Sequence, residues 1–250
     1  MSLFSTGDGS NSTDREVAEG VYRFGTRRIN WYVLEAEAGL TIVDTGLPAH
    51  WPQLGDWLDE NGYELDDVAA VVLTHADADH VGFARILADR GVPVYSHPDE
   101  LPLLRRHPQS PPGWLLRNLW RPQFFVYVLE MLRDGIRSVE PVPDPETFAD
   151  GDILPVPGEP RVILAPGHTP GSCALFVENR DVLLCGDVLA TRNIFSGQEG
   201  DPQLLGAADE DHDEARTSLA RLEGLGSVTL LPGHGNPWRG DVDEALDLAR

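Results

Sequence analysis

Short runs of β-prone apolar residues alternate with amphipathic stretches along most of the chain. Each run is bounded by glycine or charged residues, as strands usually are. The runs predict strands over residues 21–24, 29–34, 40–43, 68–73, 92–95, 161–164, 173–177, 182–184 and 228–231. Helical spacing of apolar residues predicts helices over residues 48–61, 80–90 and 210–223 and from residue 242 onward. Strands interleaved with helices indicate an α/β fold.

Two segments depart from this pattern. Residues 1–20 are rich in Ser, Thr, Gly and Asp and are predicted to form a flexible tail, which leaves residues 21–250 as a single domain. The segment 107–145 is rich in aromatic residues, and its most apolar stretch, 124–129, is far shorter than the ~18 residues that a membrane-spanning helix needs. We expect a helical insertion there. Its apolar surface would pack on the core, act as a lid or contact a second subunit.

The charge balance excludes several partners. The 250 residues contain 41 Asp and Glu against 19 basic residues, all of them arginine, for a net charge of −22. Such a charge repels phosphate backbones and anionic lipids, so we expect neither nucleic acid nor membrane as a partner. An acidic surface without lysine predicts adaptation to high salt. A GC-rich genome would explain the missing lysine but not the excess of acid.

The N-terminal residues and the cysteines predict a cytoplasmic location. The first 20 residues are polar and contain no apolar core of a signal peptide. Because a cytosolic disulfide is uncommon, Cys173 and Cys185 are predicted to be small buried side chains. Three other histidines, His50, His107 and His212, lie in polar or Pro-rich surroundings and are predicted to face solvent.

Four side chains of metal-ligand type follow the apolar run at 68–73 within six positions. They are His75, Asp77, Asp79 and His80, separated only by alanines. In an extended segment, alternate side chains project to one side, and a turn into the next helix can bring His80 round to join them. Without a cation, crowding these carboxylates would be costly. The segment therefore predicts a metal site at the end of a strand.

Three later fragments repeat the design of an apolar strand, a tight turn and a ligand. They place His168, Asp187 and His234 directly after predicted strands. With the first cluster they make seven candidate ligands, four His and three Asp, which suffice for two divalent ions in one cleft.

With these residues, the chain resembles the metallo-β-lactamase superfamily, with its His-x-His-x-Asp-His signature. The resemblance covers residues 19–250 and implies a four-layer αββα fold, in which two mixed β-sheets lie between helices. It implies that His75 and His168 belong to one metal site. It also implies that Asp79, His80 and His234 form a second site and that Asp187 bridges the two.

Two further fragments refine the resemblance. Residues 41–46 resemble the family's acidic turn, where Asp44 would support the ligands from behind. Residues 166–172, Pro-Gly-His-Thr-Pro-Gly-Ser, are closer to the glyoxalase II and thioesterase-like branch than to enzymes that degrade antibiotics.

One position departs from the signature, because Asp77 replaces its second histidine. If Asp77 binds metal, the carboxylate favours harder ions such as Mn²⁺ or Fe²⁺ over Zn²⁺. If it turns away, only the second site fills. We expect two divalent ions, with Zn²⁺ first and Mn²⁺ or Fe²⁺ as alternatives.

The resemblance implies a metal-dependent hydrolase that cleaves a small ester, thioester or lactone with a metal-activated water, which Asp79 would orient. Two other functions stay open: an iron-dependent oxidoreductase similar to the persulfide dioxygenases that share this fold, and a non-catalytic binding module. The expected partners are a small-molecule substrate and a second copy of the chain, in contact through residues 107–145.

Overall fold

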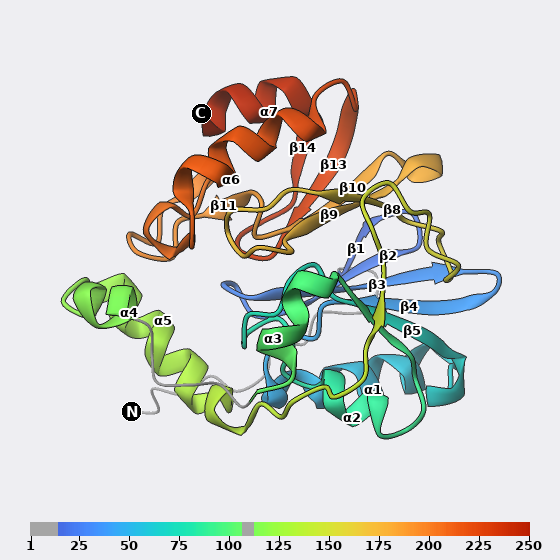
Figure 1. Cartoon of the computed structure of the whole chain (residues 1–250). Coiled ribbons are helices and arrows are strands. Elements are labelled where there is room, and N and C mark those ends of the chain that lie inside the picture. The colour runs from blue at the N-terminus through green and yellow to red at the C-terminus, as the bar shows by residue number, and fades with distance from the viewer. Residues whose placement is uncertain (1–14, 107–112) are drawn as a thin grey trace, which may run out of the picture.

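Two mixed β-sheets face each other between layers of helices (Figure 1). The computed structural model describes residues 15–106 and 113–250. Within them, the first sheet comprises, in spatial order, β1 (Glu16–Ala18), β2 (Val21–Gly25), β3 (Asn30–Ala36), β4 (Gly39–Val43), β5 (Val68–Val72), β6 (Val94–Ser96) and β7 (Glu146–Thr147). Pairs from β1 to β4 are antiparallel, and those from β4 to β7 are parallel.

The second sheet repeats this mixed character. Its spatial order is β14 (Trp238–Asp241), β13 (Ser227–Pro232), β10 (Val182–Gly186), β9 (Cys173–Val177) and β8 (Arg161–Leu164). Only β10 and β13 pair in parallel. The strands β11 (Ala190–Arg192) and β12 (Glu199–Gln203) pair as a separate antiparallel ribbon. The predicted hairpin at 173–184 is confirmed as the antiparallel pair β9–β10.

Helices cover both outer faces. Figure 1 shows α1 (Trp51–Asn61) and α2 (Ala84–Ala88) below the first sheet, and α6 (His212–Ser218) and α7 (Val242–Ala249) above the second. The short α3 (Leu101–Leu104) lies in front, and α4 (Gly113–Asn118) and α5 (Pro122–Arg133) project to one side. This is the four-layer αββα arrangement that the resemblance implied.

Three stacked hydrophobic cores hold the layers together. They form because successive side chains along each strand point to opposite faces of its sheet. On β3, Trp31 and Val33 pack toward α1 and α2, whereas Tyr32 and Leu34 pack between the sheets. On β10, Val182 and Leu184 likewise face the inter-sheet core, while Leu183 and Cys185 face α7 and the turn at 219–222 that follows α6. Because both faces of each sheet are covered, these strands are almost continuously apolar. Cys173 and Cys185 are buried free thiols in two of these cores, as predicted.

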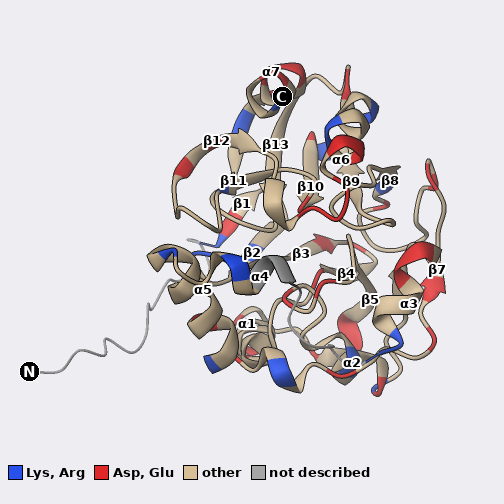
Figure 2. Ribbon diagram, turned by 60° about the vertical axis from the view of Figure 1, so that its left-hand side comes forward, with Lys and Arg blue, Asp and Glu red and all other residues tan. Residues whose placement is uncertain are grey.

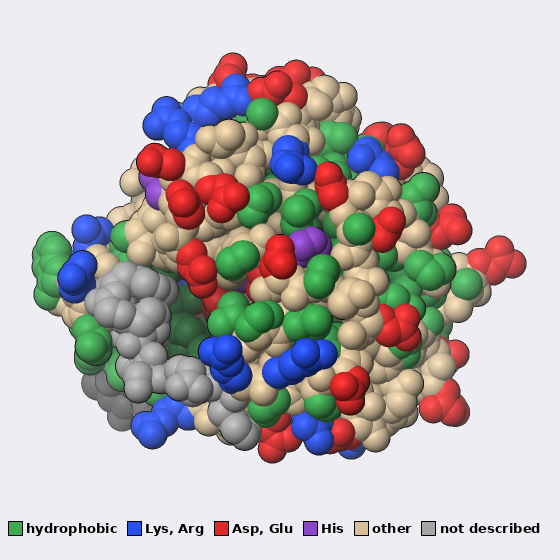
Figure 3. Space-filling view, in the orientation of Figure 1, with side chains coloured by type: hydrophobic (Ala, Val, Ile, Leu, Met, Phe, Trp, Pro, Cys, Tyr) green, Lys and Arg blue, Asp and Glu red, His purple; other side chains and the backbone are tan. Residues whose placement is uncertain are grey.

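Helices α4 and α5 occupy the range predicted for an insertion, and α5 is anchored by Phe124 and Tyr127. Several apolar side chains of this region are exposed, namely Leu116, Trp120, Phe125, Val126, Leu129 and Leu132. Figure 3 shows hydrophobic side chains at the outer edge of the molecule on this side. Within the two described ranges, no helix is long and apolar enough to cross a bilayer.

Three local expectations are wrong. The tail was expected to extend to Gly20, but Glu16–Ala18 forms β1 and pairs with β2. The helix expected over 80–90 is only Ala84–Ala88, because the backbone of the residues before it pairs with the loop after β4. His50 is buried rather than solvent-facing, since its ring accepts the Leu47 backbone N–H. His107 lies outside the described residues.

Candidate metal centre

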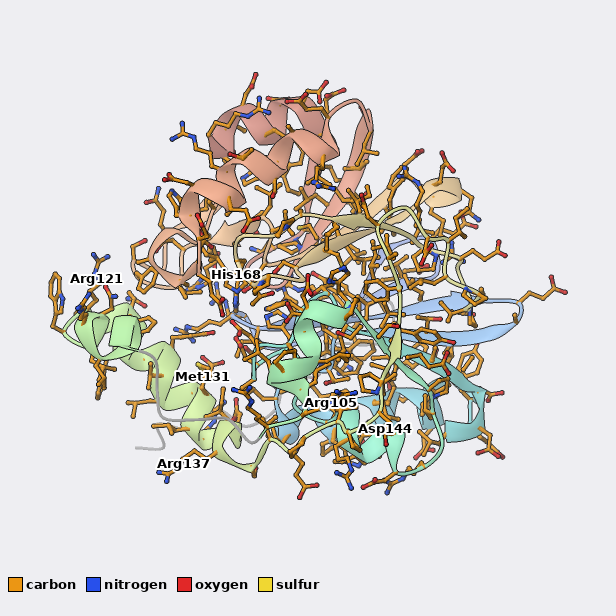
Figure 4. The ribbon with its side chains drawn as sticks, viewed as in Figure 1. Arg105, Arg121, Met131, Arg137, Asp144 and His168 are labelled. Atoms are coloured by element: carbon orange, nitrogen blue, oxygen red, sulfur yellow. The ribbon has the colours of Figure 1, made fainter. Side chains whose placement is uncertain are left out.

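The candidate ligands all follow strands whose carboxyl ends point to one edge of the sandwich. Asp44 follows β4, the 75–80 loop follows β5, Asp187 follows β10 and His234 follows β13. Since β4 and β5 run parallel, as do β10 and β13, their ends meet at a common edge. His168 follows β8 and lies between the two halves of the molecule (Figure 4).

A close backbone approach shapes the loop that carries four of the candidates. Gly82 N–H donates to the Gly46 carbonyl at 2.8 Å, and Thr45 N–H donates to the His80 carbonyl at 2.6 Å. A side chain at Gly82 would collide with the Leu47 backbone, so only glycine fits. This contact ties the 75–80 loop to the turn that carries Asp44.

The structure brings six of the seven predicted ligands together in two groups. One group is His75, His168 and Asp187, and the other is Asp79, His80 and His234. Within each group the potential ligand atoms lie within 4.8 Å of one another. All six residues are buried.

Asp187 lies between the two groups. Its Oδ2 is 3.5 Å from His168 Nε2 and 3.0 Å from His234 Nε2, while its Oδ1 is 3.4 Å from His80 Nε2. One carboxylate thus reaches nitrogen atoms of both groups, which is the position a bridging ligand would need.

Three inward-facing atoms are buried and have no hydrogen-bond partner among residues 15–106 and 113–250: His75 Nε2, His80 Nε2 and Asp187 Oδ1. Buried polar atoms without partners are costly and uncommon in folded proteins. Imidazole nitrogen and carboxylate oxygen are common ligands for Zn²⁺ and other divalent transition-metal ions. The donor set at this position therefore fits bound divalent cations.

The buried carboxylates and histidines of the centre shift one another's pKa values. Burial alone would raise the pKa of Asp187, but His234 and His80 hold it well below its usual value. Burial alone would lower the pKa of His80, yet Asp187 and Asp44 raise it to about 10. Burial lowers the pKa of His75, and the neighbouring His80 adds to that effect. Asp187 is thus a buried carboxylate balanced by histidines.

Each of the four histidines has an outer partner on Nδ1, which leaves Nε2 facing the centre. His80 Nδ1 lies 2.9 Å from Asp44 Oδ2, His168 Nδ1 lies 3.2 Å from Asp209 Oδ1, and His75 Nδ1 lies 3.0 Å from Thr74 Oγ1. His234 Nδ1 lies 2.5 Å from the Arg28 carbonyl oxygen. Such contacts orient metal-binding histidines and fix their tautomer.

Asp44 itself is firmly held. Its φ of 57° places a non-glycine residue in the left-handed region, where strain is stored. Its carboxylate accepts the Thr74 backbone N–H at 2.8 Å and the Thr74 hydroxyl. This geometry aims the remaining carboxylate contact at His80.

Asp77 stands apart from the two groups. Its side chain is 42% exposed, and its Oδ2 lies 3.2 Å from His168 Nε2. The carboxylate therefore contacts, at the rim of the centre, the same nitrogen that faces Asp187.

Two residues with no predicted role also reach this region. The Tyr127 hydroxyl, carried by α5, donates to Asp79 Oδ2 at 2.6 Å. Asp209, buried in the loop before α6, contacts His168. The only sequence signal for Tyr127 was the aromatic content of its segment, and nothing local marked Asp209.

The four-layer fold and the two groups of His and Asp at the edge of the sandwich define a metal-binding protein. The sequence profile of the metallo-beta-lactamase superfamily matches residues 24–234. The chain belongs to this superfamily.

Individual relatives agree with that assignment. The probable metallo-hydrolase YflN of Bacillus subtilis is 27% identical over 240 residues, which span 90% of this chain and 87% of the relative. The metallo-beta-lactamase family protein TTHA1429 of Thermus thermophilus superimposes with a TM-score of 0.66 at 25% identity, over 93% of this chain and 79% of the other. TTHA1623 in a di-iron-bound form gives a TM-score of 0.59 at 25% identity, over 87% and 92%.

Proposed function

We propose that the chain is a metal-dependent hydrolase with a binuclear centre. Membership of the superfamily and the similarity to probable metallo-hydrolases support this at the level of the superfamily. The observation that carries it is the set of buried atoms on His75, His80 and Asp187 that face one centre and make no hydrogen bond to any described residue. In the proposal, Asp187 bridges the two groups.

When bound, divalent ions would supply Lewis-acid polarisation and an acidified water. The chain's own residues orient the side chains that would bind the ions. Asp44, Asp209, Thr74 and the Arg28 carbonyl hold the four ring orientations, and Tyr127 holds the Asp79 carboxylate. Asp79, with one oxygen on the Tyr127 hydroxyl, is proposed to orient the attacking water.

The proposed substrates are small esters, thioesters or lactones. The support is the Pro-Gly-His-Thr-Pro-Gly-Ser loop at 166–172, which resembles the thioesterase-like branch. Zn²⁺ is the first candidate, and Asp77 at the rim would favour Mn²⁺ or Fe²⁺ if it binds metal.

A second candidate is an iron-dependent oxidoreductase on the same fold. It is favoured by one observation, the similarity to TTHA1623 in a di-iron-bound form. Oxygen consumption separates the two, since hydrolysis uses none.

The test combines elemental analysis of the purified chain with turnover of a thioester and lactone panel in an oxygen electrode. Asp187→Asn should abolish turnover and lower the metal content. Asp181→Asn is a matched control at the exposed β9–β10 turn and should leave both unchanged. Substrate-dependent oxygen uptake would contradict the hydrolase. Metal binding without turnover of any panel member would contradict the proposed substrate class.

A further inference from the structure

A buried carboxylate outside the metal centre joins two of its loops. Glu100, at the start of α3, is fully buried. Its Oε2 accepts the Ala76 backbone N–H at 2.7 Å. Its Oε1 accepts the Gly171 backbone N–H at 2.7 Å and the Thr169 hydroxyl at 2.7 Å.

The two oxygens thus bind different loops. Ala76 adjoins His75 in the loop after β5, and Thr169 adjoins His168 in the loop after β8. Ion-to-amide hydrogen bonds of this length are the strong class. Burial raises the pKa of Glu100, and the three donors on its carboxylate offset part of the cost of burying its charge.

Glu100 and the loop at 169–172 are closely packed. A Cβ placed on Gly171 would lie 2.8 Å from both Cγ and Oε1 of Glu100, so glycine lets the backbone approach the carboxylate. Ser172 Oγ also accepts the Thr169 backbone N–H at 2.9 Å, which fixes that loop on itself. The distance between the two loops is therefore set through Glu100.

We infer that Glu100 is a positioning residue for the metal group of His75, His168 and Asp187, acting by holding the loops of the two histidines at a fixed separation. The inference rests on the proposed metal centre. The other group, Asp79, His80 and His234, meets Glu100 through the 75–80 loop, by the bond to the Ala76 N–H. Removing Glu100 should therefore affect that group far less.

Glu100→Gln tests this with little change in shape. An amide group cannot accept on both ends, so one of the two loops must lose its acceptor whichever way the amide turns. We expect Zn²⁺ affinity, measured by chelator competition on metal-free protein, to fall about 10- to 100-fold for one equivalent. In a His168→Ala background, which removes the dependent group, Glu100→Gln should change the remaining affinity by no more than about twofold.

Glu35→Gln is the matched control. Glu35 accepts the hydroxyls of Tyr63 at 2.7 Å and Tyr22 at 2.8 Å, and it pairs with Leu40 at the end of β4 opposite Asp44. This substitution should leave both Zn²⁺ affinities unchanged. Thermal unfolding establishes that each variant folds. If Glu100→Gln does not fold, Thr169→Val, which deletes one of the three donors to Glu100, takes its place.

Equal weakening of both equivalents, no weakening of either, or loss of all binding in His168→Ala alone would overturn the inference. Zn²⁺ binding by the unmodified chain without turnover of the substrate panel would contradict the proposed substrate class, but the Zn²⁺ affinities of the Glu100 variants would still test this inference. An unmodified chain that binds no Zn²⁺ would overturn both.

Discussion

At the scale of single residues, the two ring nitrogens of each histidine in the metal centre have different roles. Nδ1 is held from outside by a carboxylate, a hydroxyl or a carbonyl, and Nε2 is thereby directed inward. His50, away from the metal centre, is also held through Nδ1, which accepts the Leu47 backbone N–H, and its buried Nε2 has no hydrogen-bond partner in the described part of the chain.

His50 predicts a pH-dependent loss of stability. Burial lowers its pKa from 6.5 to about 4, because the charged ring would be desolvated. Between these values the unfolded chain takes up a proton that the folded chain refuses. The free energy of unfolding should therefore fall as the pH drops from 6.5 to about 4, by about 3 kcal/mol from this residue.

His50→Asn isolates that contribution, since asparagine keeps an acceptor for Leu47 and does not titrate. Urea unfolding at several pH values should give a shallower pH dependence for the variant than for the unmodified chain over this window. Parallel pH curves would show that His50 titrates normally in the folded state.

The ligand candidates could be predicted because each directly follows an apolar run, a pattern visible in the local sequence. Asp209, Glu100 and Tyr127 could not be found that way. They lie in a loop and two helices, and their hydrogen-bond partners are distant in the sequence. Asp209 contacts His168, 41 positions away, Glu100 accepts from Thr169, 69 positions away, and Tyr127 donates to Asp79, 48 positions away. Likewise, polar neighbours wrongly predicted an exposed His50, because a local backbone donor buries it.

At the scale of elements, the loop after β5 depends on one glycine. Gly82→Ala should destabilise the protein by about 3 kcal/mol, because the new methyl group meets the Leu47 backbone, which cannot yield as a side chain can. Gly55→Ala is the control. It lies within α1 with open space around it and should stabilise by about 0.5–1 kcal/mol. Denaturant unfolding measures both, and a tolerated Gly82→Ala would contradict the close packing of these loops.

The same backbone contacts explain why the helix predicted over 80–90 is short. Periodicity reports which face of a segment is apolar, but it does not report that His80 and Gly82 pair with the loop after β4. Strand positions were predicted more closely, since covered sheets give unbroken apolar runs.

Helix α5 is linked to the centre by the Tyr127 hydroxyl. Tyr127→Phe removes the donor from the buried Asp79 carboxylate and should lower the free energy of unfolding of the metal-free chain by about 1.5–3 kcal/mol. Tyr63→Phe removes a phenol donor from the less buried Glu35 and should cost less than about 1 kcal/mol. Equal losses of stability in the two variants would contradict a stronger contribution from the Tyr127–Asp79 hydrogen bond than from the Tyr63–Glu35 hydrogen bond.

At the scale of the whole molecule, the charge of −22 acts against compactness. Acidic residues are spread over both halves of the fold, and arginines occur on α4 and α5 (Figure 2). Salt shortens the Debye length from about 10 Å at 0.1 M to about 3 Å at 1 M and so screens the repulsion. We expect the Tm to rise as NaCl increases over that range. A constant or falling Tm would contradict the predicted adaptation to high salt.

The most direct test of the whole account is anomalous diffraction at the zinc absorption edge from crystals grown with Zn²⁺. We predict two peaks, one about 2 Å from the Nε2 atoms of His75 and His168 and one at the same distance from those of His80 and His234, with Asp187 between them. Zinc bound elsewhere on the protein, with no peak among these four histidines, would contradict it.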